Sequence, residues 1–144
     1  MIISRDLSKE GESPFSVSDL PSCNDIGQNV GITGTPAIDP STNTVYFWAK
    51  SYMVSGQSGV RNGAYRFHAA DTITLAERPG FPTNIQNTPG TINLGRLSLS
   101  VTFAADNDNT RWFNGGTDLQ RASLNLVNGV GFAGFGGHCS HNQC

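Results

Sequence analysis

Two segments far apart in the chain carry the same strand–turn–strand pattern. The first spans 31–50 and turns at 40–43, and the second spans 121–135 and turns at Asn128-Gly129. Proline, serine and asparagine favour the first turn, and Asn-Gly between apolar runs is the strongest short hairpin signal. The repetition predicts a chain built from β-hairpin units.

The first hairpin is predicted to hold a short strand over 31–39 and a β-branched, aromatic strand over 44–50. Side chains alternate between the two faces of a strand. On the second strand this gives two sets, Val45, Phe47 and Ala49 on one face and Tyr46, Trp48 and Lys50 on the other. Because both sets are largely apolar, we expect this strand to be covered on both sides.

The residues that follow complete a four-stranded unit. A loop rich in glycine and serine over 51–63 leads to a third strand over 64–71, and a turn over 72–75 leads to an outer strand over 76–81. Pro79 lacks an N–H, which places that last strand at an edge. Four consecutive antiparallel strands form one blade of a β-propeller.

A long polar connection over 83–116 separates the two units. It contains one strand-like run, 97–103, in which apolar and polar residues alternate. Beyond it, strands are predicted over 121–127 and 130–135. The two hairpins lie further apart than the roughly 40–50 residues of common propeller repeats. The connection is therefore interpreted as an insertion in the second blade.

These patterns predict an all-β chain of antiparallel four-stranded blades, a β-propeller fragment of about two blades. Within the partial propeller of residues 1–144, one blade is assigned to 31–82 and part of the next, with its inserted loop, to 97–139. Residues 1–30 are assigned to the end of a preceding blade and a connection. A propeller closes with about four to eight blades, so the expected partners are the remaining blades of a longer chain.

Composition limits the other partners. Charged residues make up 14% of the chain, the net charge is −2, and the arginines are scattered singly. The chain therefore has no basic stripe for nucleic acid. No stretch approaches the roughly 20 consecutive apolar residues that span a bilayer, so no membrane span is expected. The N-terminus turns polar after Ile3, which predicts no signal peptide within this chain.

Several ordered segments carry a resemblance to a known family. They are Cys23 to Ile26, Val30 to Asp39, Tyr65 to Asp71, Leu119 to Leu124, Asn128 to Val130 and Phe135 to Cys139. Together they resemble the pyrroloquinoline-quinone-type β-propeller repeat proteins, with the fold of quinoprotein alcohol dehydrogenases, and most of all their secreted, uncharacterised fungal and bacterial members. The likeness covers about 14–139, apart from the loop over 84–103. It implies a propeller fold and an extracellular location.

The chain departs from the family at the motif that locks blades together. The family has Ala-x-Asp, a turn that ends in Thr-Gly, and then tryptophan. Ala69, Asp71 and Thr74 match this motif, but Leu75 stands where glycine is expected and Pro79 lies near the tryptophan position. The resemblance therefore implies weaker docking between blades at this turn.

The C-terminal run holds four side chains of the types that bind zinc, His138, Cys139, His141 and Cys144. Structural cysteines in a loop are favoured over a metal site, because neighbouring His138 and Cys139 would point to opposite sides of a strand and no second cluster adds ligands. With Cys23 the chain has three cysteines, an odd number whose pairing the sequence leaves open. A disulfide between Cys23 and Cys139 is a hypothesis, since each lies beside one of the repeated hairpins.

Three aspartates and two asparagines form a second polar cluster, Asp106, Asn107, Asp108, Asn109 and Asp118. They lack the spacing and the final glutamate of a calcium loop. Because Asp and Asn favour turns, the cluster is interpreted as a solvated loop.

His68 lies in an apolar strand and is predicted to be structural, because a catalytic histidine needs a partner and the sequence names none. No pair of carboxylates can be assigned to acid–base work, since Glu10 and Glu12 lie in a polar terminus and Glu77 stands alone. Trp48 is interpreted as packing in the core.

The expected function is a propeller-fold binding or scaffold module in a larger secreted protein, with its ligand and activity unassigned. The alternative that the resemblance implies is part of a quinone-dependent dehydrogenase, an oxidoreductase that would use pyrroloquinoline quinone and calcium. Under both interpretations, no catalytic, cofactor-binding or metal-binding residue is assigned in this chain.

Overall fold

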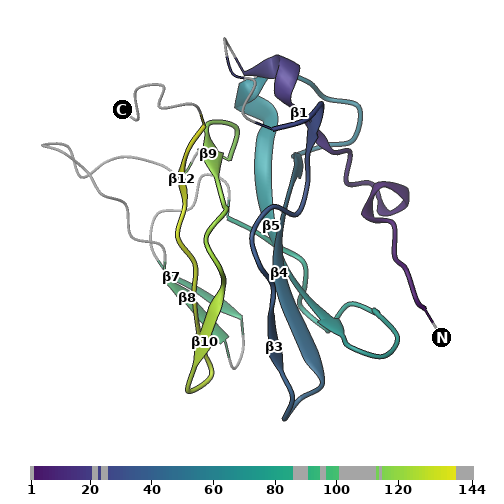
Figure 1. The fold of residues 1–144 in the computed structure, drawn as a ribbon, viewed down its shortest axis with the longest axis vertical. Coiled ribbons are helices and arrows are strands. Elements are labelled where there is room, and N and C mark those ends of the chain that lie inside the picture. The colour runs from purple at the N-terminus through teal and green to yellow at the C-terminus, as the bar shows by residue number, and fades with distance from the viewer. Residues whose placement is uncertain are drawn as a thin grey trace, which may run out of the picture.

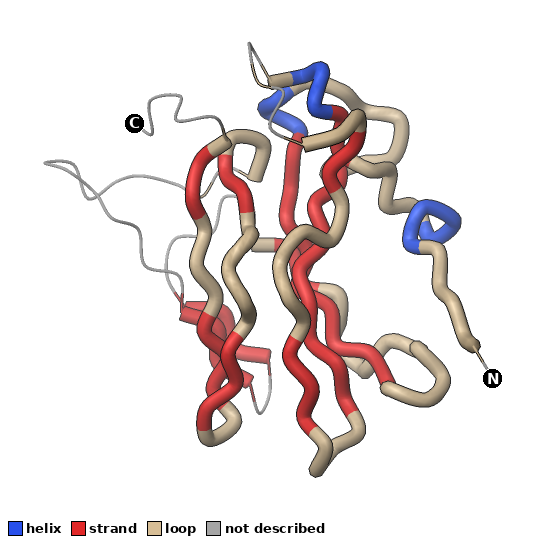
Figure 2. Tube along the Cα trace, in the orientation of Figure 1, coloured by secondary structure: helices blue, strands red, loops and turns tan. Residues whose placement is uncertain are grey.

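The computed structural model describes residues 2–20, 23, 26–85, 91–94, 97–100, 113 and 115–138. Within them the fold is all-β, and its strands pair antiparallel (Figure 2). The helical pieces in the described residues are short 3₁₀ turns, η1 (Leu7–Glu10), η2 (Val17–Asp19) and η3 (Val60–Asn62). No helix in these residues is long and apolar enough to cross a membrane.

One four-stranded antiparallel sheet forms the centre of the molecule. Its strands lie in the order in which they occur along the chain, β3 (Ala37–Asp39), β4 (Thr44–Tyr52), β5 (Gly63–Asp71) and β6 (Thr83–Asn84). The predicted hairpin and third strand are confirmed. The strands β4 and β5 each run further into the predicted loop over 51–63, because their pairing continues to Tyr52 and Gly63.

The predicted fourth strand over 76–81 is wrong. Its pairing with β5 is limited to a single bridge between Ala70 and Glu77. The chain then turns, because Pro79 has no N–H to donate and Gly80 adopts φ +87°. The edge strand forms only after this turn, at β6.

The two faces of β4 and β5 differ in chemistry. Cross-strand partners share a face, so Trp48 lies beside Phe67 while Phe47 lies beside His68 on the other side. Every residue of β4 is buried or half-buried. This confirms the prediction that the strand is covered on both sides.

The second predicted hairpin is confirmed as β10 (Asn125–Val127) and β11 (Val130–Phe132). Its turn has positive φ at Asn128, 50°, and at Gly129, 77°. This is the conformation that Asn-Gly hairpins adopt. The segments before and after this hairpin also pair with each other, as β9 (Asp118–Leu119) and β12 (Gly136–Gly137).

The second hairpin packs against the aromatic face of the central sheet (Figure 1). Leu124 donates its backbone N–H to the Thr35 carbonyl at 3.0 Å. The shared core is mostly aromatic and consists of Tyr46, Trp48, Tyr65, Phe67, Ala69, Ile85, Phe113 and Leu124, with Leu126 and Phe135 packed against it.

Two smaller pairs complete the described fold. The strands β1 (Phe15–Ser16) and β2 (Asn29–Val30) contribute to a second core, which also contains Tyr52 and Leu119. The predicted connection over 83–116 was expected to hold one strand. Its described residues form the edge strand β6 and two further strands, β7 (Thr91–Leu94) and β8 (Leu97–Ser100). The end of the predicted run, 101–103, lies outside the described residues.

Figure 1 shows the resulting order, with the β9–β12 segment on one side of the central sheet and the N-terminal segment on the other. The central sheet is thus covered on one side by an apolar hairpin and on the other by residues that include charged side chains.

Candidate functional site

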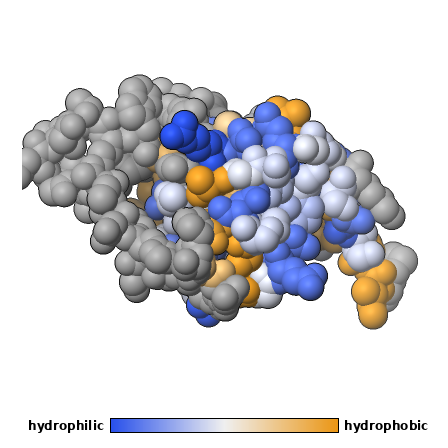
Figure 3. Space-filling view, turned by 90° about the horizontal axis from the view of Figure 1, so that it is seen from above, coloured by the Kyte–Doolittle hydropathy of each residue, from blue (hydrophilic) through white to orange (hydrophobic). Residues whose placement is uncertain are grey.

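The outward side of the second hairpin presents apolar side chains to solvent. Val127 pairs with Val130, and the two share a face with Phe132. These three residues, here named the open hairpin face, are 53%, 49% and 57% exposed. On the opposite side of the same strands, Leu126 packs into the shared core. Seen from above, the described surface is mostly hydrophilic and its apolar residues form separate patches (Figure 3).

The other face of the central sheet holds a buried histidine between two carboxylates. His68 is fully buried and stacks on Phe47, with ring centroids 4.7 Å apart. Its Nδ1 lies 3.2 Å from Glu77 Oε2, and its Nε2 lies 3.4 Å from Glu12 Oε2. Glu77 comes from the turn segment after β5, and Glu12 comes from the N-terminal segment.

Two arginines complete this cluster, which we name the His68 cluster. Arg5 donates from Nη1 to Glu77 Oε2 at 2.6 Å and also pairs with Glu10. The hydrogen bond from Arg5 lowers the pKa of Glu10. Arg66 lies on the same sheet face as His68, with Nη1 3.9 Å from Glu12 Oε2.

The structure supplies partners for His68 that the sequence does not name, Glu12 and Glu77. The prediction missed them because Glu12 and Glu77 reach His68 from segments far apart in sequence. The available signal was His68 itself, a titratable residue in an otherwise apolar strand. Since His68 is fully buried, the arrangement is suited to holding a proton or an ion pair rather than to contacting a substrate.

A buried lysine anchors the C-terminal part of the chain to the sheet. Lys50 donates from Nζ to the carbonyl oxygens of Gly116 at 2.9 Å and Asp118 at 2.8 Å, and lies 2.8 Å from His138 Nε2. Its ammonium also lies 4.3 Å from the centre of the Phe15 ring. Of the predicted C-terminal zinc-ligand types, His138 therefore serves this anchor, while 139–144 lies outside the described residues.

Tyr65 ties the same segment to β5 from within the core. Its hydroxyl oxygen accepts the backbone N–H of Gln120 at 2.9 Å. Burial raises the pKa of Tyr65 to about 12. The phenol therefore stays neutral and keeps this contact across the neutral range.

Cys23 is disulfide-bonded and buried. Its partner cysteine lies outside the described residues, so the pairing with Cys139 stays a hypothesis. Trp48 packs on Phe67 at 4.6 Å between ring centroids and meets Phe135 edge-on at 5.2 Å, as expected for a core residue.

The polar cluster of Asp106 to Asn109 and Asp118, interpreted as a solvated loop, is described only in part. Asp118 lies in β9, while 106–109 falls outside the described residues. No group of three or more His, Cys, Asp or Glu side chains that could hold a metal occurs among the described residues. No described set of side chains therefore fits a calcium and quinone site.

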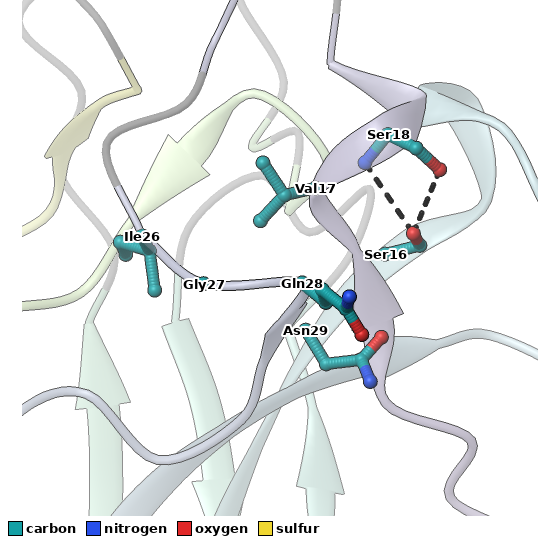
Figure 4. Close-up of a pocket in the computed structure, with 7 residues that line it drawn as sticks. All are labelled: Ser16, Val17, Ser18, Ile26, Gly27, Gln28 and Asn29. Atoms are coloured by element: carbon teal, nitrogen blue, oxygen red, sulfur yellow. Dashed lines mark hydrogen bonds between the residues drawn. The ribbon is translucent and has the colours of Figure 1, made fainter.

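An open pocket of about 580 Å³ lies between η2 and the segment leading into β2 (Figure 4). It is lined by Ser16, Val17, Ser18, Ile26, Gly27, Gln28 and Asn29. The hydroxyl of Ser16 accepts the backbone N–H of Ser18 at 3.3 Å and lies 2.8 Å from its hydroxyl. The serine groups are thus already engaged with each other.

Comparison of the chain with protein-family models, curated proteins and solved structures found no match in any of the three. The propeller family therefore stays a prediction from the residue pattern.

Proposed function

We propose that this chain is a propeller-type binding or scaffold module of a larger secreted protein, and that its open hairpin face receives a further antiparallel β unit. The four-stranded sheet in chain order and the hairpin packed on its face support this proposal, because successive propeller blades have this arrangement.

The main observation behind the proposal is that the two sides of the second hairpin differ in burial. Its inner side is buried in the aromatic core, whereas Val127, Val130 and Phe132 on its outer side are about half exposed. Burying a Val or Phe side chain stabilises by about 1.5–3 kcal/mol. Because these side chains are already about half covered, covering the rest would favour association by roughly half of that amount per residue.

The disulfide at Cys23 supports the secreted part of the proposal, since disulfides persist mainly in oxidising compartments. No described group of residues favours the quinone-dependent dehydrogenase. Binding through a sheet face is accordingly the proposed activity.

The experiment is sedimentation velocity of the 144-residue chain over a range of concentrations, together with binding of the dye ANS. We expect the unaltered chain to self-associate and to bind ANS, and Phe132→Lys to weaken both. Ile73→Lys is the matched control, because Ile73 is 66% exposed in a turn remote from the hairpin.

The proposal would be contradicted if the unaltered chain were monomeric and bound no ANS, and if neither Phe132→Lys nor Ile73→Lys changed this. Such a chain would already have a closed core, and the outer side of the hairpin would be ordinary surface.

A further inference from the structure

The N-terminal residues 2–12, here named the strap, are fastened to the charged face of the central sheet. Arg5 donates to the carbonyl of Leu75 at 3.3 Å and pairs with Glu77 at 2.6 Å. At the other end of the strap, Glu12 lies against His68. The strap lies on the opposite side of the sheet from β10 (Figure 1).

The contacts of His68 require more protons than a neutral imidazole carries. Both ring nitrogens face carboxylate oxygens, at 3.2 Å on Glu77 and 3.4 Å on Glu12. A neutral imidazole has one N–H, and its other nitrogen presents a lone pair. Glu12 Oε2 and His68 Nε2 are both fully buried and have no hydrogen-bond partner. Only the imidazolium offers a donor to each carboxylate.

We infer that His68 holds the strap against the sheet when its ring is protonated and releases it when the ring is neutral. As the imidazolium it can donate from Nδ1 to Glu77 and form an ion pair through Nε2 with Glu12, and so joins the turn segment, the sheet and the strap. When Nε2 gives its proton to water as the strap opens, its lone pair faces the Glu12 carboxylate and the strap is no longer held there. No other bond is made or broken in this step.

The charged groups around the ring determine the direction of the pH effect. Glu12 and Arg5 face it from the strap, Glu77 from the turn segment, and Arg66 from β5. Beyond them, Glu10 is held by Arg5. Phe47 covers one face of the ring and carries no charge.

Because the closed strap favours the protonated ring, strap closure strengthens as pH falls. One linked proton changes the opening equilibrium by at most about tenfold per pH unit.

The test is hydrogen exchange of the strap, measured by mass spectrometry on the full chain between pH 5.5 and 8 and corrected for intrinsic exchange rates. We expect protection of residues 2–12 to fall as pH rises. In Glu12→Gln the amide can donate to the neutral Nε2, so the strap should stay closed and lose its pH dependence. Glu10→Gln is the control and should keep it, because Glu10 pairs with Arg5.

A second measurement on the unaltered chain does not depend on any variant folding. The ¹⁵N chemical shifts of the His68 ring should show both nitrogens protonated at pH 5.5, where the strap is protected. A neutral tautomer at pH 5.5 would overturn the inference. So would strap protection that does not change with pH, or a Glu12→Gln slope equal to that of the unaltered chain.

Discussion

Leu75 adopts a left-handed backbone conformation, φ 57°, in the turn after β5. Asp71 shapes this turn by accepting the backbone N–H groups of Ile73 and Thr74, each at 2.9 Å. The propeller resemblance implies glycine at the Leu75 position, and the observed φ is one that glycine adopts without strain. Leu75 therefore places a branched side chain at a backbone conformation that favours glycine.

Replacing Leu75 tests this conformation. A side chain in the left-handed region costs roughly 1–2 kcal/mol, whereas glycine avoids that cost. We expect Leu75→Gly to have a free energy of unfolding about 0.5–1 kcal/mol higher than that of Leu75→Ala, as measured by urea unfolding. At Ile73, in the same turn but without positive φ, the alanine variant should be the more stable. If the alanine variant were more stable than the glycine variant at both positions, Leu75 would be unstrained.

The buried charge of Lys50 is expected to contribute to the free energy of unfolding. In Lys50→Met the carbonyls of Gly116 and Asp118 and the ring of His138 lose their shared donor. A hydrogen bond to a charged group contributes about 1.5–3 kcal/mol, so we expect a loss of about 2–5 kcal/mol in urea unfolding. Arg61→Met, at an exposed position, should stay within about 0.5 kcal/mol. A Lys50→Met chain as stable as the Arg61 control would show that this anchor contributes nothing.

Among the elements, those with a strong local pattern were predictable. The β-branched strand β4 and the hairpin around Asn128-Gly129 occur where the sequence places them. The edge strand β6 has only two residues, too few to show a period-two pattern. The strap was assigned to a preceding blade; its contacts with His68 and Glu77 depend on tertiary placement, which no local pattern encodes.

Gly116 allows the C-terminal segment to approach η3 closely. A Cβ on this residue would lie 1.7 Å from the backbone oxygen of Val60, so the two segments would have to move apart. Overpacking of this kind costs about 1–3 kcal/mol. We expect Gly116→Ala to lower the urea midpoint and to alter the near-ultraviolet circular dichroism of the aromatic core. Gly31→Ala is the control, since nothing lies within 4 Å of its added Cβ, and equal effects in both variants would contradict this account.

The two sides of the central sheet are covered through different kinds of contact. One side is joined to a second β unit by aromatic packing, and the other is joined to the strap by charged contacts. Composition and alternation predicted an all-β chain with a strand covered on both sides. They could not predict which segment covers each side, because that depends on residues distant in sequence.

The second hairpin packs face to face on the central sheet, and the two are joined through the rings of Trp48 and Phe135, which meet edge-on at 5.2 Å. A double-mutant cycle between these two residues tests this packing. With Trp48→Leu and Phe135→Leu, we predict a coupling energy of about 0.5–1.5 kcal/mol. Trp48→Leu and Phe15→Leu, whose residues belong to different cores, should be additive. A coupling of zero between Trp48 and Phe135 would contradict face-to-face packing.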